Sequence, residues 1–191
     1  EEGADVIDVG GESTRPGALA IPQKEEISRI FPVIKELCRN NIKVSCDTRN
    51  SKTMKKVLDE GVEIINDVSG LNYDKSTINI IKEYNCYYVL MHSIKNPATM
   101  QINPMYDNVI SDVYYFLLEK ISLIKRECNN TKVIIDPGIG FGKNDFHNFQ
   151  ILKYFPIFLD LGLPILIGLS RKSFIGRFMQ NENEDRLPCS I

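Results

Sequence analysis

The chain has 191 residues, of which 43% are hydrophobic and 25% are charged, and this composition excludes fibrous, collagen-like and disordered proteins. The 23 basic and 25 acidic residues leave a net charge of -2 without any block of Lys or Arg, which argues against a nucleic-acid or anionic-membrane surface. No apolar stretch approaches the roughly 20 residues that span a bilayer, and no signal-peptide pattern opens the sequence. We therefore expect one domain over residues 1–191, located in the cytoplasm.

A recurring unit organises the chain: a helical segment, a glycine, and a short apolar run that ends in a polar side chain. The unit predicts strands at residues 4–8, 62–66 and 163–168, and three further apolar runs predict strands at 42–47, 87–92 and 133–136, which makes six. Apolar residues spaced three and four apart predict helices at 27–38, with a kink at Pro32, and at 54–58 and 109–124. The 5 cysteines are odd in number and widely spaced, so we expect them to be reduced and structural.

Strands that alternate with helices predict an α/β fold with parallel β/α units. Apolar strands covered on both faces fit either an open sheet or a closed (β/α)8 barrel of the TIM type. The strand ends favour the barrel, because nearly every strand ends in a polar residue, whereas an open sheet gathers its chemistry at one switch point. Such a barrel has about 250 residues, so we expect about six of its eight units here, in a fragment lacking the first and last. The polar strand ends are Asp8, Asp47, Asn66, His92 and Asp136, and His92 is thereby a candidate functional histidine.

Two loops after predicted strands carry groups that bind anions or flat rings. Residues 8–17 combine two glycines and a Pro-Gly turn with the hydroxyl of Thr14 and the guanidinium of Arg15. The other loop has Gly168, which lets a flat ligand come close, followed by Lys172 and a hydroxyl at a helix start. A plain polar turn with solvated basic side chains explains either loop equally well.

Carboxylates and an amide supply the remaining candidate ligands. Asp47 ends a strand, where an aspartate can also cap the following helix. Strand alternation turns only one of Asn66 and Asp67 toward the barrel centre, and the sequence does not decide which. Asp136 precedes a glycine-dense turn with Phe141 at its tip. A heterocycle with an amidine-like N–H/NH2 edge would match such a carboxylate through two parallel, charge-assisted hydrogen bonds.

Six motifs, in this order and spacing, resemble the dihydropteroate synthase family. They cover the chain from end to end: DVGGESTRPG (8–17), CDT (46–48), INDV (65–68), LMH (90–92), DPGIGFGK (136–143) and GLSRKSFIG (168–176). The resemblance implies a transferase of folate biosynthesis and a sulfonamide target. Its reaction would condense 6-hydroxymethyl-7,8-dihydropterin diphosphate with p-aminobenzoate, giving 7,8-dihydropteroate and pyrophosphate.

The resemblance also implies roles for individual residues. Asp136 would bind the pyrimidine edge of the pterin, and Lys172 would contact both the pterin and p-aminobenzoate. The catalytic residues would be Lys172, Arg15 and Asp8, the last near the developing methylene cation. The implied pterin-binding residues are Asp47, Asn66, Val68, Met91, Asp136, Phe141, Gly168 and Lys172, and those for p-aminobenzoate and diphosphate are Thr14, Arg15, Pro16 and Ser173.

The resemblance further implies Mg2+, with its main protein ligand in a segment before residue 1 and no metal ligand within these residues. It implies small-molecule substrates, neither nucleic acid nor membrane, and a homodimer at full length. We expect the 191-residue piece alone to have little or no synthase activity.

Two other interpretations stay open. The first is a pterin-binding methyltransferase barrel of the methyltetrahydrofolate type, and the second is a barrel that binds pterin, or folds with a partner, without turnover. The STRPG (13–17) and SRKS (170–173) loops disfavour the methyltransferase, which handles neither diphosphate nor p-aminobenzoate.

Overall fold

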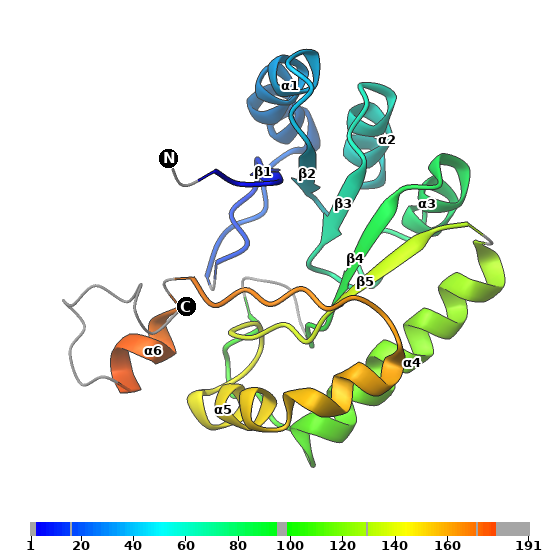
Figure 1. The fold of residues 1–191 in the computed structure, drawn as a ribbon. Helices are drawn as coiled ribbons and strands as arrows, with labels where there is room; N and C mark the ends of the chain where they lie inside the picture. Colours follow the sequence, from blue (N-terminus) through cyan, green and yellow to red (C-terminus); the bar gives the residue numbers. More distant parts are fainter. Residues whose placement is uncertain (1–2, 16, 95–98, 129, 171, 179–191) are drawn as a thin grey trace.

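The computed structural model describes residues 3–15, 17–94, 99–128, 130–170 and 172–178. Their strands form one five-stranded sheet in which all pairs are parallel and the order β1-β2-β3-β4-β5 follows the chain (Figure 1). An order without reversal is that of a β/α barrel, and it places all carboxyl ends on one side. The strands are β1 (Ile7–Gly10), β2 (Val44–Asp47), β3 (Ile64–Asp67), β4 (Tyr87–Met91) and β5 (Lys132–Asp136).

The connecting helices lie around the outside of the curved sheet (Figure 1). They are α1 (Gln23–Arg39), α2 (Ser51–Asp59), α3 (Thr77–Tyr84), α4 (Val109–Glu127) and α5 (Asp145–Lys153), followed by the 3-10 helix η1 (Phe155–Leu161) and α6 (Ser173–Phe178). Pro32 lies inside α1, which continues unbroken to Arg39. None of the helices within the described ranges is long and apolar enough to cross a membrane.

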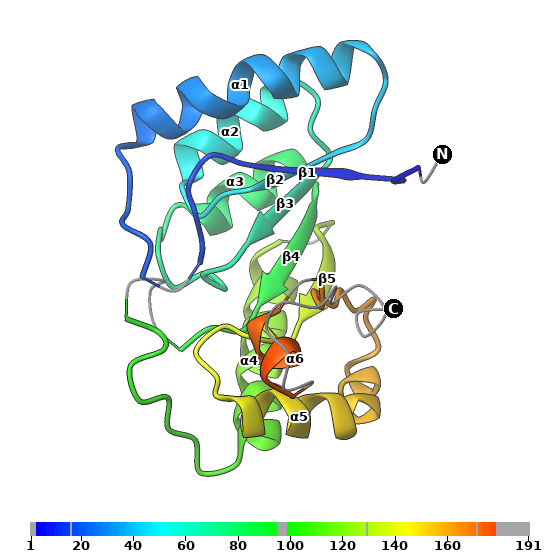
Figure 2. The same cartoon turned by 90° about the vertical axis from the view of Figure 1, so that its left-hand side faces the viewer.

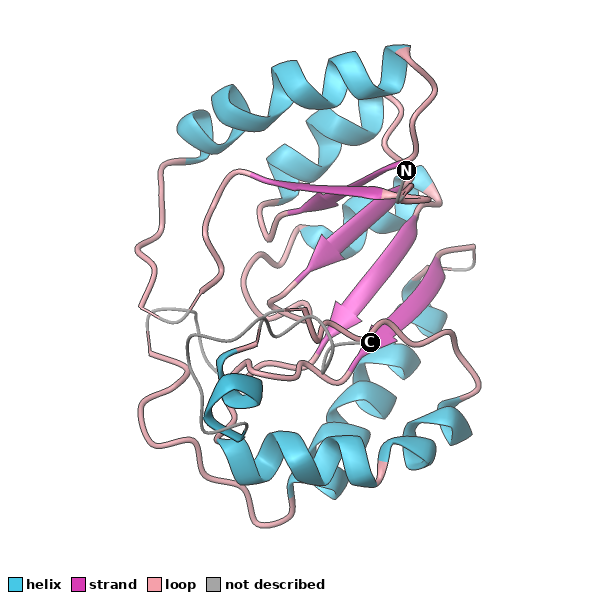
Figure 3. Cartoon of the chain, turned by 60° about the vertical axis from the view of Figure 1, so that its left-hand side comes forward, coloured by secondary structure: helices cyan, strands magenta, loops and turns pink. Residues whose placement is uncertain are grey.

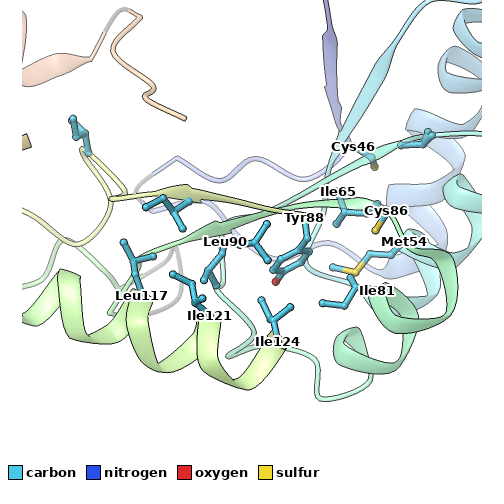
Figure 4. Packing of buried hydrophobic residues seen from close by; sticks show 14 of the residues in the cluster. Cys46, Met54, Ile65, Ile81, Cys86, Tyr88, Leu90, Leu117, Ile121 and Ile124 are labelled. Carbon is cyan, nitrogen blue, oxygen red and sulfur yellow. The ribbon is translucent and has the colours of Figure 1, made fainter. Parts of the chain in front are cut away.

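The core forms between the sheet and these helices (Figure 4). From the strands, Cys46, Ile65 and Tyr88 are fully buried, and they meet side chains of α2, α3 and α4. Burying an apolar side chain of this size stabilises the fold by about 1.5–3 kcal/mol. Because side chains alternate along a strand, filling one face with the core leaves the neighbouring residues for the other face. The helical partners include Met54, Ile81, Leu117, Ile121 and Ile124.

Four of the six predicted strands match the structure to within two residues at each end, and the first and the sixth differ more. The first was expected to end at Asp8 but runs from Ile7 to Gly10, because Gly10 stays extended and pairs with Asp47. The sixth is wrong as a strand: only Ile165 forms a bridge, with Ile135. Its backbone nevertheless runs beside β5, since the nitrogen of Ile135 donates to the oxygen of Pro164 at 2.9 Å. Pro164 has no N–H of its own to extend the ladder, which explains why pairing stops at one residue.

Candidate functional site

The strand register brings the predicted polar residues onto one face of the sheet. Gly10 pairs with Asp47, and Asp47 pairs with Asn66. Two strands further along, Met91 pairs with Asp136. These residues alternate with the core residues Cys46, Ile65 and Tyr88, so they face away from the helices. The loops that follow β1, β4 and β5 extend from the carboxyl ends of the strands toward the same side (Figures 2 and 3).

Asp136 is the best-supported carboxylate of this face. Its side chain is buried, and its Oδ1 accepts a hydrogen bond of 2.7 Å from the nitrogen of Gly138. Burial raises the pKa of Asp136 to about 6, while the Gly138 N–H and the charges of Lys143 and Lys172 act in the opposite direction. Near neutral pH this group is therefore an ionised, buried hydrogen-bond acceptor.

Lys172 and Phe141 lie beside this carboxylate. The Nζ of Lys172 is 4.5 Å from the centre of the Phe141 ring, a cation–π contact. Burial lowers the pKa of Lys172, and the charge of Asp136 partly restores it. Ser173 follows as the exposed first residue of α6, and the space around Gly168 is open, with no heavy atom within 4 Å of where a Cβ would stand. The structure thus brings Lys172 and Phe141 to Asp136.

Asp47 and Asp8 form an acidic pair at the β1–β2 end of the face. The Oδ1 of Asp47 is buried without a hydrogen-bond partner. Burial, followed by the charges of Asp8, Asp67 and other acids, raises the pKa of Asp47 to about 8. Asn66 lies next to the pair and donates from Nδ2 to Asp8 at 3.3 Å. A ligand that donates an N–H here would satisfy an oxygen that now has no partner.

The structure decides between the neighbours Asn66 and Asp67. Asp67 is fully buried and accepts hydrogen bonds from the Tyr88 hydroxyl at 2.5 Å and from the nitrogens of Ser69 and Leu71. These contacts tie Asp67 to the core, so its role is structural. Asn66 is therefore the one of the two that lies on the site face, where its amide donates to Asp8. Val68, expected to pack on the ring, is buried directly after β3.

His92 lies against residues 138–142, the glycine-rich segment after β5. It is buried, and its Nδ1 is 2.9 Å from the Nζ of Lys143. Burial, together with the charge of Lys143, holds the pKa of His92 well below its usual range, so the ring is neutral. The polar contact of His92 is therefore with Lys143. The sequence analysis did not single out Lys143.

The loop after β1 is fastened at its base by Glu12, another residue that sequence reasoning missed. Glu12 accepts two hydrogen bonds from the buried Arg49, at 2.8 and 3.0 Å, and one from the nitrogen of Ile21 at 3.1 Å. Farther along, Thr14 is half-buried and Arg15 is exposed. Pro16, expected in the same loop, lies outside the described residues. No spacing rule could have paired residues 12 and 49.

Metal binding would depend on the acidic, histidine and cysteine side chains. Within the ranges that the structure describes, no group of three or more His, Cys, Asp and Glu side chains is arranged to hold a metal ion. Mg2+ is commonly held by one or two carboxylates together with substrate phosphates, so a site completed by a ligand does not require such a group.

Comparison with known proteins identifies the family. The family model described as "Pterin binding enzyme" matches residues 1–191. The dihydropteroate synthase of Escherichia coli K12 is 37% identical over 191 residues, covering 99% of this chain and 67% of the relative. That of Clostridium beijerinckii is 38% identical, covering 100% of this chain and 69% of the relative. The chain thus spans about two thirds of these relatives' length.

Solved structures agree with the sequence relatives. The Xanthomonas albilineans dihydropteroate synthase with 4-aminobenzoic acid has a TM-score of 0.86 and 37% identity, over 98% of this chain and 66% of that one. The Yersinia pestis enzyme with a sulfonamide drug has a TM-score of 0.92 and 33% identity, over 98% of this chain and 68% of that one. Both are TIM-type barrels, which confirms the predicted fold class. The chain belongs to the dihydropteroate synthase family of pterin-binding enzymes.

Proposed function

We propose that the protein condenses 6-hydroxymethyl-7,8-dihydropterin diphosphate with p-aminobenzoate, giving 7,8-dihydropteroate and pyrophosphate. The family supports this activity, and so do relatives whose structures contain 4-aminobenzoic acid or 7,8-dihydropteroate. The observation that carries the proposal is that three polar side chains lie on one sheet face near the carboxyl ends of β2, β3 and β5. These groups are Asp47, Asn66 and Asp136.

The pterin ring would bind through its pyrimidine edge. The ionised carboxylate of Asp136 can accept from a ring N–H and an amino group together, in two parallel hydrogen bonds. Asn66 offers a donor and an acceptor to the same ring, and the unpartnered Oδ1 of Asp47 can accept one more hydrogen bond. Val68, Met91, Phe141 and Gly168 would surround the ring.

The chemical step would break the bond between the pterin methylene carbon and the diphosphate oxygen, with the electron pair leaving on diphosphate. The amine nitrogen of p-aminobenzoate would then bond to that carbon and lose a proton. Lys172 stands near both partners in this arrangement and would orient them, since its Nζ lies over Phe141 and near Asp136. Asp8 would place negative charge near the developing cation. Thr14, Arg15, Pro16 and Ser173 would hold the diphosphate and p-aminobenzoate.

Isothermal titration tests this proposal through the order of binding. We expect pterin diphosphate to bind first and to create affinity for p-aminobenzoate, which does not bind measurably alone. Binding of tetrahydrofolate without this order would instead support a methyltransferase, and the absence of any pterin response would overturn both activities.

The same proposal covers the broader expectations from the family. Residues 1–191 would form one pterin-binding unit, acting in the cytoplasm and as a homodimer when full length. Magnesium belongs to the same proposal as an ion bound with the diphosphate, because Mg2+ is commonly held by one or two carboxylates together with substrate phosphates. Sedimentation velocity of the full-length protein would test the dimer, and a single species of monomer mass would contradict it.

A further inference from the structure

The buried ammonium group of Lys143 is the strongest unassigned feature of the molecule. Only 2% of this side chain is exposed. Its Nζ lies 2.9 Å from Nδ1 of His92, 2.9 Å from the oxygen of Gly138 and 3.0 Å from the oxygen of Phe141. A third backbone oxygen, that of His92, is 3.4 Å away. The N–H groups of Lys143 thus donate hydrogen bonds to backbone oxygens.

The segment that Lys143 contacts is rich in glycine. Gly138, Gly140 and Gly142 all have positive φ angles, of 70°, 81° and 63°, and have no side chains to pack. A Cβ on Gly138 would stand 2.0 Å from the oxygen of His92, so the segment must stay free of side chains there. Residues 138–142, which we call the glycine loop, are anchored by the buried Ile139 and by one internal hydrogen bond, from the nitrogen of Phe141 to the oxygen of Gly138 at 3.1 Å, and side chains outside them supply further hydrogen bonds.

Side chains from other segments also form hydrogen bonds with the glycine loop. Gln101 donates from Nε2 to the oxygen of Gly140 at 2.6 Å, and the Tyr106 hydroxyl donates to the oxygen of Gly142 at 2.8 Å. Asn148 accepts from the nitrogen of Gly140 at 2.8 Å. Lys143 is buried, as Asn148 is, and it differs from all three because its one amino group contacts two oxygens of the loop, those of Gly138 and Phe141.

Both ends of the glycine loop lead to the proposed pterin site. At one end, the nitrogen of Gly138 donates to Asp136, so the position of Gly138 sets the orientation of that carboxylate. At the other end, Phe141 carries the ring on which Lys172 lies. We propose that Lys143 is a positioning residue for pterin binding, which fixes the glycine loop so that Asp136 and Phe141 keep the geometry that accepts the ring. This inference rests on the proposed function.

The cost of burying the Lys143 amino group also favours a role in shaping the glycine loop. Burial, reinforced by the charge of Lys172, lowers the pKa of Lys143 to about 7, although the charge of Asp136 opposes the shift. A buried charge of this kind is weak evidence for stability, because apolar residues of similar size commonly stabilise a core equally well. What an apolar residue cannot supply is the set of hydrogen bonds to Gly138 and Phe141. The lysine is therefore better explained by the geometry of the loop than by the stability of the fold.

Calorimetric titration of plain pterin into Lys143→Met tests the inference, because methionine keeps the length and removes the donors. The wild type must first bind pterin; if it does not, the proposed function itself fails. We then expect the Kd of the variant to rise by roughly tenfold or more at an unchanged number of sites per chain. A merely destabilised protein would instead show fewer sites at the wild-type Kd, which would overturn the inference. The matched control is Lys125→Met, on the exposed side of α4, which should bind as the wild type does.

Gln101→Ala keeps the inference testable if Lys143→Met does not fold. Gln101 is exposed, so its truncation removes a hydrogen bond to the glycine loop without opening the core. We expect the Kd for pterin to rise by about threefold to fivefold, in line with the loss of one neutral hydrogen bond. An unchanged Kd in this variant would show that the hydrogen bonds around the glycine loop do not set pterin affinity.

Discussion

The two glycine-containing loops of the site differ in how they are held. The glycine loop after β5 receives hydrogen bonds from Lys143, Gln101 and Tyr106 along its whole length. The loop after β1 is fastened at Glu12, whereas Arg15 farther along is exposed. One loop is therefore shaped before any ligand arrives, and the other keeps its functional side chains in solvent.

This difference fits an ordered reaction. A preformed site loses less conformational entropy on binding, so the β5 end is suited to bind the rigid pterin ring first. An exposed arginine is suited to close on a diphosphate or a second substrate that comes later. The two substrates would therefore meet two kinds of surface, one preformed and one exposed.

Removing the side chain of Arg49, the partner of Glu12, should have the largest effect, and the effect is on stability. In Arg49→Met, the buried Glu12 carboxylate would lose both of its charged hydrogen bonds. We expect the free energy of unfolding to fall by about 3–5 kcal/mol, as when one member of a buried ion pair is removed. Urea unfolding measures the change. Adding Glu12→Gln should recover part of it, and equal losses in the single and double variants would contradict the explanation.

The control for this prediction is Arg126→Met, which breaks the exposed ion pair with Glu127. Such surface pairs contribute about 0–1 kcal/mol. The contrast between the two arginines then separates the anchoring of the β1 loop from a general effect of losing an arginine.

Truncating Asp136, at the carboxyl end of β5, should have the second largest effect. Asp136→Ala removes the two charge-assisted hydrogen bonds proposed for the pterin and leaves Gly138 N–H without its acceptor. We expect pterin affinity to fall by roughly 100-fold, equivalent to about 2.7 kcal/mol. The exposed Asp145, which pairs with Arg177, gives the matched control Asp145→Ala. Normal pterin binding by Asp136→Ala in calorimetry would show that the ring binds elsewhere.

The strands and the shared face could be predicted from local sequence. Glycine followed by a short apolar run located β1 and β3, further apolar runs located β2, β4 and β5, and polar residues at the strand ends indicated where a ligand would bind. Alternation alone left Asn66 and Asp67 undecided. The choice depends on Tyr88, whose hydroxyl binds Asp67 from a neighbouring strand, and such a contact has no signature in the local pattern.

The residues that hold the loops could not be predicted, for a different reason. Glu12 pairs with Arg49 across 37 positions, and Lys143 meets His92 across 51. Each of these residues resembles an ordinary polar residue in its own segment. Only the closed fold shows that they are buried and paired, so the supports of a site are harder to find in a sequence than its ligands.

The pH dependence of pterin binding should report on the same preformed end. The pKa of Asp136 is about 6 in the free protein, and the hydrogen bonds proposed for the ring require its ionised form. Affinity should therefore rise with pH through about 6 and be roughly tenfold weaker at pH 5 than at pH 7. Titrations at the two pH values measure this. A flat profile between them would mean that the neutral carboxyl binds the ring as well as the ionised one.

Substitution of Arg15, in the exposed loop after β1, should have the smallest effect. It tests most directly whether the two loops bind different parts of the substrates. Arg15→Ala removes a solvent-exposed side chain, so plain pterin, which lacks the diphosphate, should bind with a Kd within about twofold of the wild type. Pterin diphosphate should bind about fivefold to tenfold more weakly, because a charge-assisted contact to a phosphate is lost. Arg39→Ala, at the end of α1, is the control for losing one positive charge. If plain pterin weakened as much as its diphosphate, the β1 loop would contribute to the ring site, and the division between a preformed and an exposed end would be wrong.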